Sequence, residues 1–188
     1  MKKALIVLAS PHKNGPTSML LHSFLAGLNG EEWETEVLDV CKDPVKPCVA
    51  CGACKVKDGC IYHDMDAFDT AFRTCDLFVV ASPVYNLSFP AQFKALLDRF
   101  QRYFEARFTR GVRPVMEKKR KAVLLLTMGQ HDDFAVEVCE KTLHQSFSIL
   151  NVKLIRTLCL PDTDKGVEEQ HPVFEKAGRI AIEIENEL

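Results

Sequence analysis

Short apolar runs alternate with segments of helical periodicity along the whole chain. The runs Lys3–Ala9 and Ala122–Thr127 are apolar almost throughout, as expected of strands that are covered on both faces. The pattern predicts strands at Lys3–Ala9, Glu34–Val40, Leu77–Ala81, Ala122–Thr127 and Lys153–Leu160. It predicts helices at Pro16–Leu28, Met65–Arg73, Pro90–Phe108, Asp133–Leu150 and Val167–Leu188. Gly30 closes the first helix, and Asp64 is a plausible N-cap of the second.

This alternation predicts an α/β fold, in which a five-stranded parallel sheet carries helices on both faces. Right-handed crossovers leave few topologies, and the strand order 2-1-3-4-5 is the strongest candidate. In that order a ligand crevice lies beyond the carboxyl ends of the first and third strands. The 188 residues are expected to form one domain with a cysteine-rich insertion at about residues 41–62.

The composition is that of an ordinary globular protein. Hydrophobic residues make up 47% of the chain and the formal net charge is -2, so no basic surface for nucleic acid is expected. The apolar run near the N-terminus is too short to cross a membrane and lacks a signal-peptide cleavage pattern. We therefore expect a cytoplasmic protein that does not associate with membranes.

Four of the eight cysteines have the spacing C-x2-C-x2-C-x5-C and are Cys48, Cys51, Cys54 and Cys60. Thiolates this close in sequence can converge on one soft metal centre. The spacing favours a [4Fe–4S] cluster, because a compact loop with two-residue gaps supplies three of its four ligands. A structural zinc site more often uses two separated C-x2-C pairs, and a site without metal is the third alternative. The remaining cysteines, Cys41, Cys75, Cys139 and Cys159, are expected to act as small buried hydrophobic residues.

The predicted first strand leads into a hydroxyl-rich turn, residues 9–18, at a helix N-terminus. Free backbone N–H groups and the positive end of the helix attract a phosphate there. Ser10, Thr17 and Ser18 add hydroxyl donors, and Asn14 adds an amide. No Walker lysine motif is present, so a triphosphate is not implied, and an ordinary capped helix start remains the alternative.

Two further loops are expected at the same edge of the sheet. In the segment 82–90, Tyr85 offers a flat face to a ring, and the N–H groups after Pro83 can bind a polar heterocycle. The alternative is that the aromatic side chain only packs on the core. After the fourth strand, Gly129 permits close approach of a ligand and Gln130 can bind a ring edge. His131 is given no firm catalytic role.

The segments 10–17, 82–85 and 94–99 resemble the NADPH-dependent FMN reductase branch of the flavodoxin-like superfamily. The cysteine run, which closes in Cys60–Met65, is similar to that of the iron–sulfur flavoproteins in this branch. The resemblance spans Lys3 to about Gln130. It implies that the FMN phosphate is held by Ser10, His12, Asn14, Thr17 and Ser18. It implies that the isoalloxazine ring is held by the third loop, with Gly129 and Gln130, and by Pro83, Val84, Tyr85, Asn86 and Leu87.

Three residues depart from the family pattern: Ala9, His12 and Pro16 stand where a glycine, an arginine and an asparagine are usual. Histidine in place of arginine removes a permanent positive charge. If His12 contacts the phosphate, FMN affinity is expected to be lower and to depend on pH.

The function expected from this resemblance is that of an FMN-dependent oxidoreductase. It takes electrons from NAD(P)H or ferredoxin and passes them between FMN and a [4Fe–4S] cluster or a small-molecule acceptor. The chemistry takes place at flavin N5, so no catalytic side chain is predicted, and the cluster can be absent from a purified sample. The alternatives are an NAD(P)H:FMN or quinone reductase without a cluster, a non-enzymatic flavodoxin-like electron carrier, and a flavin-free signalling or scaffold domain.

A homodimer or homotetramer is also expected. The predicted helix after Pro90 carries apolar residues around much of one side, namely Phe93, Leu96, Leu97, Phe100, Tyr103 and Phe104. The family resemblance implies subunit pairing along this side, and a wide core-facing stripe is the alternative.

Overall fold

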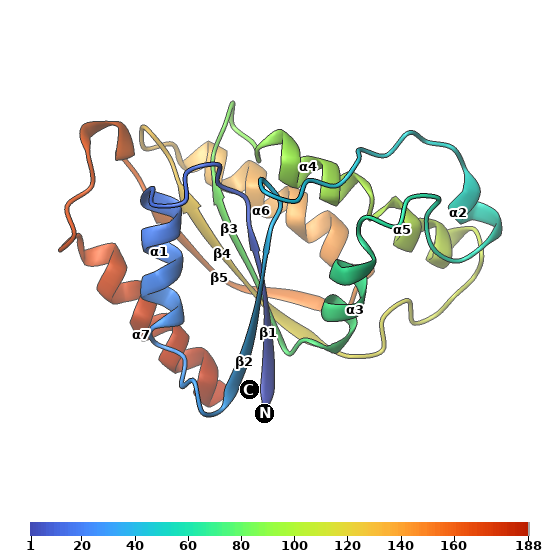
Figure 1. The fold of residues 1–188 in the computed structure, drawn as a ribbon, viewed down its shortest axis with the longest axis horizontal. Helices are drawn as coiled ribbons and strands as arrows, with labels where there is room; N and C mark the ends of the chain where they lie inside the picture. The colour runs from blue at the N-terminus through green and yellow to red at the C-terminus, as the bar shows by residue number, and fades with distance from the viewer. Residues whose placement is uncertain (188) are drawn as a thin grey trace.

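The computed structural model describes residues 1–187, which contain a five-stranded sheet in the order β2-β1-β3-β4-β5 (Figure 1). Each neighbouring pair of strands is parallel. The strands are β1 (Lys2–Leu8), β2 (Trp33–Asp39), β3 (Leu77–Pro83), β4 (Arg120–Thr127) and β5 (Val152–Leu160). The predicted fold class and strand order are therefore confirmed.

Helices cover both faces of this sheet (Figure 1). They are α1 (Pro16–Leu25), α2 (Ala53–Val56), α3 (Asp66–Thr74), α4 (Ala91–Asp98), α5 (Gln101–Phe108), α6 (Asp133–Phe147), the 3-10 turn η1 (Thr163–Lys165) and α7 (Pro172–Glu187). Alternate residues of β1 point to opposite faces. Leu5 and Val7 pack in the core beneath α3 to α6, whereas Ala4 and Ile6 pack beneath α1 and α7. The strands are thus covered on both sides, which explains their near-continuous apolar sequences.

The first helix ends at Leu25 rather than at the predicted Leu28. The chain closes the helix with a hydrogen bond of 3.1 Å from the Gly27 N–H to the Phe24 carbonyl. A Cβ on Gly27 would overlap the Gly178 carbonyl of α7. The chain needs a glycine here because α1 and α7 pack backbone against backbone at this point.

The predicted single helix over Pro90–Phe108 is wrong, because two helices, α4 and α5, occupy this range. Between them the N–H groups of Phe100 and Arg102 bond to carbonyls three residues back, Leu97 and Arg99. This tightening is of 3-10 type and needs no glycine or proline, so nothing in the sequence announces it. At the break, the Arg99 side chain turns towards the segment that contains the clustered cysteines.

Two other predicted helix starts also need correction. The last helix begins at Pro172 rather than at Val167, and proline is favoured at a first helical turn. Its predicted last residue, Leu188, lies outside the described residues. Asp64 does not cap α3: the N-cap is Met65 without a side-chain hydrogen bond, and Asp64 is bound elsewhere.

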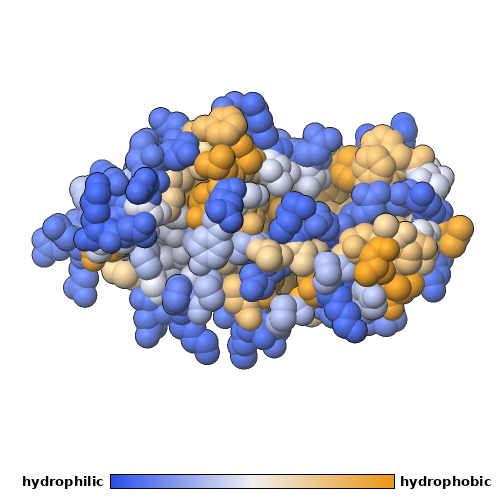
Figure 2. All heavy atoms as spheres, turned by 90° about the horizontal axis from the view of Figure 1, so that it is seen from above, coloured by the Kyte–Doolittle hydropathy of each residue, from blue (hydrophilic) through white to orange (hydrophobic). Residues whose placement is uncertain are grey.

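Most of the apolar residues of the predicted helix after Pro90 face the core. Phe93, Leu96, Leu97, Phe100 and Tyr103 are buried, so for them the alternative of a core-facing stripe holds. Phe104 is 43% exposed and its ring lies 4.6 Å from that of Phe108, which is also exposed. Figure 2 shows apolar side chains gathered at the end of the molecule that carries α2 and α5. The exposed apolar residues there are Val49, Val56, Ile61, Phe104 and Phe108.

The four cysteines outside the cluster differ in burial. Cys75 and Cys139 are buried, as predicted, whereas Cys41 and Cys159 are only half-buried. Within residues 1–187, no helix combines the length and apolar character needed to cross a membrane.

Candidate functional site

Three loops meet at the carboxyl edge of the sheet, and we call residues 9–18, 82–90 and 127–131 together the rim. The Ala9 N–H donates to the Ala81 carbonyl at 2.8 Å, and the Val84 N–H donates to the Thr127 carbonyl at 2.8 Å. The hydroxyl groups of Thr17 and Thr127 lie 2.7 Å apart in the buried part of the rim. These bonds join the ends of β1, β3 and β4, so the three predicted loops are neighbours in space.

The first rim loop presents free donors at the start of α1. Within residues 1–187, the N–H groups of Thr17 and Ser18 have no backbone acceptor, as expected in the first turn of a helix. Ser10 lies beside them, buried, and its Oγ accepts the N–H of His12 at 3.3 Å. His12 and Asn14 are exposed. The predicted phosphate residues therefore lie together around one helix N-terminus, where an anion is stabilised.

The second rim loop is a tight turn. The Tyr85 N–H donates to the Ser88 carbonyl at 2.8 Å, and the Ser88 N–H donates back at 3.0 Å. Between them Asn86 and Leu87 have φ of 50° and 62°, which is the pattern of a type I′ turn. Leucine rarely adopts this conformation, so the turn is strained at Leu87. Tyr85 is 44% exposed and lies at the surface rather than in the core.

The remaining predicted ring residues lie on either side of this turn. Pro83 and Val84 are half-buried at the end of β3, and Gly129 and the exposed Gln130 follow β4. A Cβ on Gly129 would lie 2.6 Å from Cγ of Asp164, a residue of η1. The missing side chain of Gly129 therefore makes room for Asp164, a rim neighbour that the sequence did not reveal. His131 is exposed and pairs with Asp133 at 3.2 Å.

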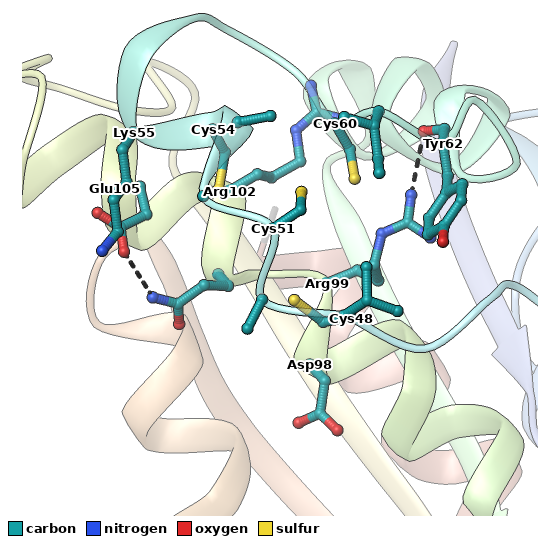
Figure 3. Close-up of a pocket in the computed structure, with 16 residues that line it drawn as sticks. Cys48, Cys51, Cys54, Lys55, Cys60, Tyr62, Asp98, Arg99, Arg102 and Glu105 are labelled. Carbon is teal, nitrogen blue, oxygen red and sulfur yellow. Dashed lines mark hydrogen bonds between the residues drawn. The ribbon is translucent and has the colours of Figure 1, made fainter.

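A second region lies at the other end of α4. The four clustered cysteines line one cavity of about 370 Å³ (Figure 3). We call residues 41–62 the cysteine segment. The cavity is closed on its other side by residues from the α4–α5 break and from α5, namely Asp98, Arg99, Gln101, Arg102 and Glu105. The four cysteines therefore share one cavity, and their binding of a single metal centre stays a prediction.

Arg99 binds the chain on both sides of the four clustered cysteines. Its guanidinium donates to the carbonyl of Lys46 at 2.9 Å and to that of Tyr62 at 3.1 Å. It also pairs with Asp64 at 2.9 Å, and the other oxygen of Asp64 accepts the N–H of Lys46 at 2.8 Å. These bonds hold the pKa of Asp64 below its usual value despite partial burial, which opposes them. We call this set of contacts the Arg99 latch, and it closes the loop without using any cysteine.

Arg102 lies on the next turn and also lines the cavity. It is 7% exposed, and Nη1 is buried without a hydrogen-bond partner among residues 1–187. Nε of Arg99 is in the same condition. Buried N–H groups in folded proteins nearly always have a partner, so two unpartnered N–H groups on residues that line one cavity point to a missing acceptor.

The thiols do not form a ready single-ion site. Among residues 1–187, no three His, Cys, Asp or Glu side chains are grouped closely enough to hold one metal ion. Burial raises the pKa of the Cys54 thiol, and negative charge on Glu105 and on the neighbouring thiolates raises it further. A metal centre that binds these sulfurs would displace their protons.

Sequence reasoning missed Arg99, Arg102 and Asp164. A signal was available for two of them, because both arginines interrupt the apolar stripe of Leu97, Phe100 and Tyr103. Charged residues at such positions are buried only when they are paired. For Asp164 no local pattern exists, since its contact with Gly129 depends on how the loop after β5 folds back.

Comparison with known proteins identifies the class. A family model described as flavodoxin-like fold matches residues 2–183. The chain therefore belongs to the flavodoxin-like family.

Within that family the chain is similar to curated iron–sulfur flavoproteins. It is 31% identical over 128 residues to the one from Archaeoglobus fulgidus, an overlap of 68% of this chain and 55% of that protein. It is 37% identical over 91 residues to the one from Methanosarcina thermophila, which covers 48% of each chain. The chain thus spans about half the length of the curated relatives it matches.

Solved structures share the fold over nearly the full chain. An NAD(P)H:quinone oxidoreductase from Methanothermobacter marburgensis superposes with a TM-score of 0.75 at 16% identity, covering 97% of this chain and 96% of that one. An azoreductase from Bacillus anthracis gives a TM-score of 0.71 at 18% identity and covers both chains completely. At these identities the likeness concerns the fold alone.

Proposed function

We propose that this protein is an FMN-dependent oxidoreductase of the iron–sulfur flavoprotein type. FMN would bind at the rim, and a [4Fe–4S] cluster would bind at the cysteine segment. The observation that carries the proposal is the cavity in which four thiols meet two buried, unpartnered guanidinium N–H groups. The similarity to curated proteins named iron–sulfur flavoprotein supports it.

The first rim loop fits a phosphate. The free N–H groups of Thr17 and Ser18 point out of the start of α1, where the helix dipole adds positive potential. The Thr17 hydroxyl is already bonded to Thr127, so Thr17 would contribute its backbone N–H. Ser10, Asn14 and His12 surround the same helix end, and His12 supplies positive charge only when protonated.

The second and third rim loops fit a flat ring. The exposed Tyr85 and the backbone beyond Pro83 would line one side of the ring, and Gly129 with Gln130 would line the other. Val84 would contribute its side chain, because its N–H is bonded to the Thr127 carbonyl. The type I′ turn fixes the direction of the N–H groups of Asn86 and Leu87, which would face the ring. The fixed backbone would orient the ring and exclude water from one of its faces.

The cysteine segment fits a multi-iron centre better than a zinc ion. A tetrahedral zinc site holds four sulfurs at about 2.3 Å from one ion, and no three ligands among residues 1–187 are grouped for that. A [4Fe–4S] cluster takes each thiolate on a different iron atom, so its ligands stand further apart. Arg102, which faces its nearest carboxylate across 3.6 Å, supplies positive charge against four thiolates, and this charge lowers the cost of keeping the thiolates deprotonated.

When bound, FMN accepts a hydride or single electrons and the cluster carries single electrons, so the pair converts two-electron into one-electron chemistry. The protein itself would bind the two cofactors, orient them and shield them from water. The rim loops supply backbone donors to the flavin, the Arg99 latch keeps the four thiols around one cavity, and no side-chain acid or base is required.

The proposal extends to partners and setting. NAD(P)H or ferredoxin would donate electrons, and a small molecule would accept them, in the cytoplasm. The exposed Phe104 and Phe108, on the cavity-bearing side of the molecule, favour assembly into a homodimer or homotetramer. The net charge of -2 offers no general attraction for nucleic acid.

The experiment is anaerobic purification and reconstitution with iron and sulfide, followed by an absorption spectrum and by flavin, iron, zinc and acid-labile sulfide analysis. We expect about one FMN and about four iron atoms per chain. A protein that takes up FMN but no iron, and oxidises NADPH, would be a plain flavin or quinone reductase. A protein that takes up neither would contradict the proposal.

A pair of cysteine variants separates the two sites. Cys51→Ser removes one cavity thiol and should abolish the four-iron spectrum while the flavin stays bound. Cys41→Ser is the matched control, since Cys41 lies in the same segment but does not line the cavity. Loss of flavin together with iron in Cys51→Ser, or loss of iron in the control, would show that the sites are wrongly assigned.

A further inference from the structure

The side chain of Arg102 extends across the cavity between Cys54 and Cys60 (Figure 3). Its guanidinium stacks near the ring of Tyr103, with 5.2 Å between Cζ and the ring centroid. Nη2 lies 3.6 Å from a carboxylate oxygen of Asp69, which is too long for a hydrogen bond. Nη1 has no partner at all within residues 1–187.

Among residues 1–187, no acceptor bonds to Nη1 of Arg102. Two carboxylates line the cavity, Asp98 and Glu105, and both are engaged elsewhere. Asp98 accepts from Lys94 at 2.6 Å, and Glu105 accepts from Gln101 at 2.9 Å and from Thr109. An unpaired buried N–H on a charged group is costly, so its natural acceptor is an anionic ligand in the cavity.

Arg99 is already neutralised, whereas Arg102 is not. Arg99 pairs with Asp64 at 2.9 Å, but Arg102 faces Asp69 across 3.6 Å, and Asp69 is shared with Arg73 at 2.9 Å and with the hydroxyl of Tyr103 at 2.6 Å. The charge that Arg102 presents to the cavity is therefore only partly screened by the protein.

We propose that Arg102 donates a hydrogen bond from Nη1 to the iron–sulfur centre held by the four thiolates, that it raises the reduction potential of this centre, and that Asp69 moderates the effect. The inference rests on the proposed function. Reduction adds one electron and thus one negative charge to the centre, with no bond in the protein formed or broken. A buried positive N–H donor stabilises the reduced form more than the oxidised form, which shifts the potential upwards.

The test is a mediated redox titration of the reconstituted protein, followed by electron paramagnetic resonance of the reduced cluster. In Arg102→Gln the ratio of reduced to oxidised cluster at a fixed potential should fall about tenfold, which is about 59 mV for a one-electron couple. Arg107→Gln is the matched control. It removes the same charge from the same helix, but Arg107 stacks on Phe108 and does not line the cavity. Its cluster should keep the wild-type potential.

A second variant, at a residue that does not line the cavity, should shift the reduction potential in the opposite direction. Asp69→Asn keeps the shape of the side chain but removes the charge that screens Arg102, so the reduced-to-oxidised ratio should rise by about threefold. If Arg102→Gln fails to retain iron, Asp69→Asn decides the matter by itself. Unchanged potentials in the iron-loaded variants overturn the inference and leave the cluster assignment standing. Wild-type protein that takes up no iron overturns both.

Discussion

The rim rests on buried strand ends, whereas the cysteine segment rests on side chains reaching out from α4 and α5. Ala9, Ser82 and Thr127, the first residues of the three rim loops, are almost fully buried. Along the cysteine segment no residue from 46 to 62 is buried. The sheet would form the rim in any sequence that folds this way, but the second site depends on a few ion pairs and on the group that it binds.

The two regions also differ in how their polar groups are satisfied. The rim loops are joined by backbone hydrogen bonds between neighbouring strands. The cysteine segment is tied by the Arg99 latch and by a pair between Arg110 and Asp58 at 2.8 Å. The strand topology alone can therefore place a cofactor-binding site at the edge of the sheet. A site on a long loop outside the sheet needs side-chain contacts of its own to stabilise it.

Breaking the Arg99 latch should have the largest effect on stability. Arg99→Met leaves Asp64 without its ion pair and two backbone carbonyls without their donor. We expect a loss of about 3 kcal/mol in the free energy of unfolding. Urea denaturation measures this loss, and limited proteolysis should cut within residues 46–62. Lys94→Met, which removes an exposed pair with Asp98 from the same helix, should change stability by less than about 0.5 kcal/mol. Equal stability losses in the two variants would contradict the latch.

The rim should respond to loss of its one buried hydroxyl pair. Thr127→Val leaves the Thr17 hydroxyl without its partner, and we expect about 1.5 kcal/mol of destabilisation. The double variant Thr17→Val with Thr127→Val should recover part of that loss, because both polar groups are then gone. A thermodynamic cycle from urea denaturation of the four proteins gives the coupling. Strict additivity would mean that the two hydroxyl groups do not interact.

Relief of the strained turn should produce a smaller change of opposite sign. Leu87→Gly allows the left-handed φ without a Cβ clash, and we expect a net gain of about 0.5 kcal/mol after the entropic cost of glycine. Leu87→Ala keeps the Cβ and should show no such gain in the thermal midpoint. If alanine stabilises as much as glycine, the benefit comes from removing exposed apolar surface and not from the backbone.

The weakest expected effect is a pH dependence located at the latch. The pKa of Asp64 is held below the usual value of 3.8 by Lys46 and Arg99, against the opposing effect of burial. The unfolded chain therefore binds the proton more readily, and this contribution to stability is present above about pH 3.8 and is lost as the pH falls through the lower folded pKa. Urea denaturation at pH 5 and pH 3 should show a smaller acid loss in Asp64→Asn than in the wild type. An identical acid loss would falsify this assignment.

The sequence predicted the structure of the rim better than that of the cysteine segment. The strands followed from local periodicity, and crossover handedness then narrowed the strand order, which brings the loops at Ser10, Tyr85 and Gly129 together. The break at Arg99 did not, since no glycine or proline marks it and the contacts of Arg99 are made with another loop. The cap assigned to Asp64 failed for the same reason: Arg99 and the Lys46 N–H compete for this carboxylate and win.

By itself the sequence determined the parallel sheet, the three loops at its edge and four cysteines close enough to share a site. Only the tertiary structure decided which residues face those cysteines. Arg99 donates to a carbonyl 53 residues away in the sequence. Arg102 lines the same cavity from α5, which the sequence pattern predicted as one helix with α4. Local patterns encode which face of an element is apolar, whereas the partner of a buried charge is fixed only when distant segments pack together.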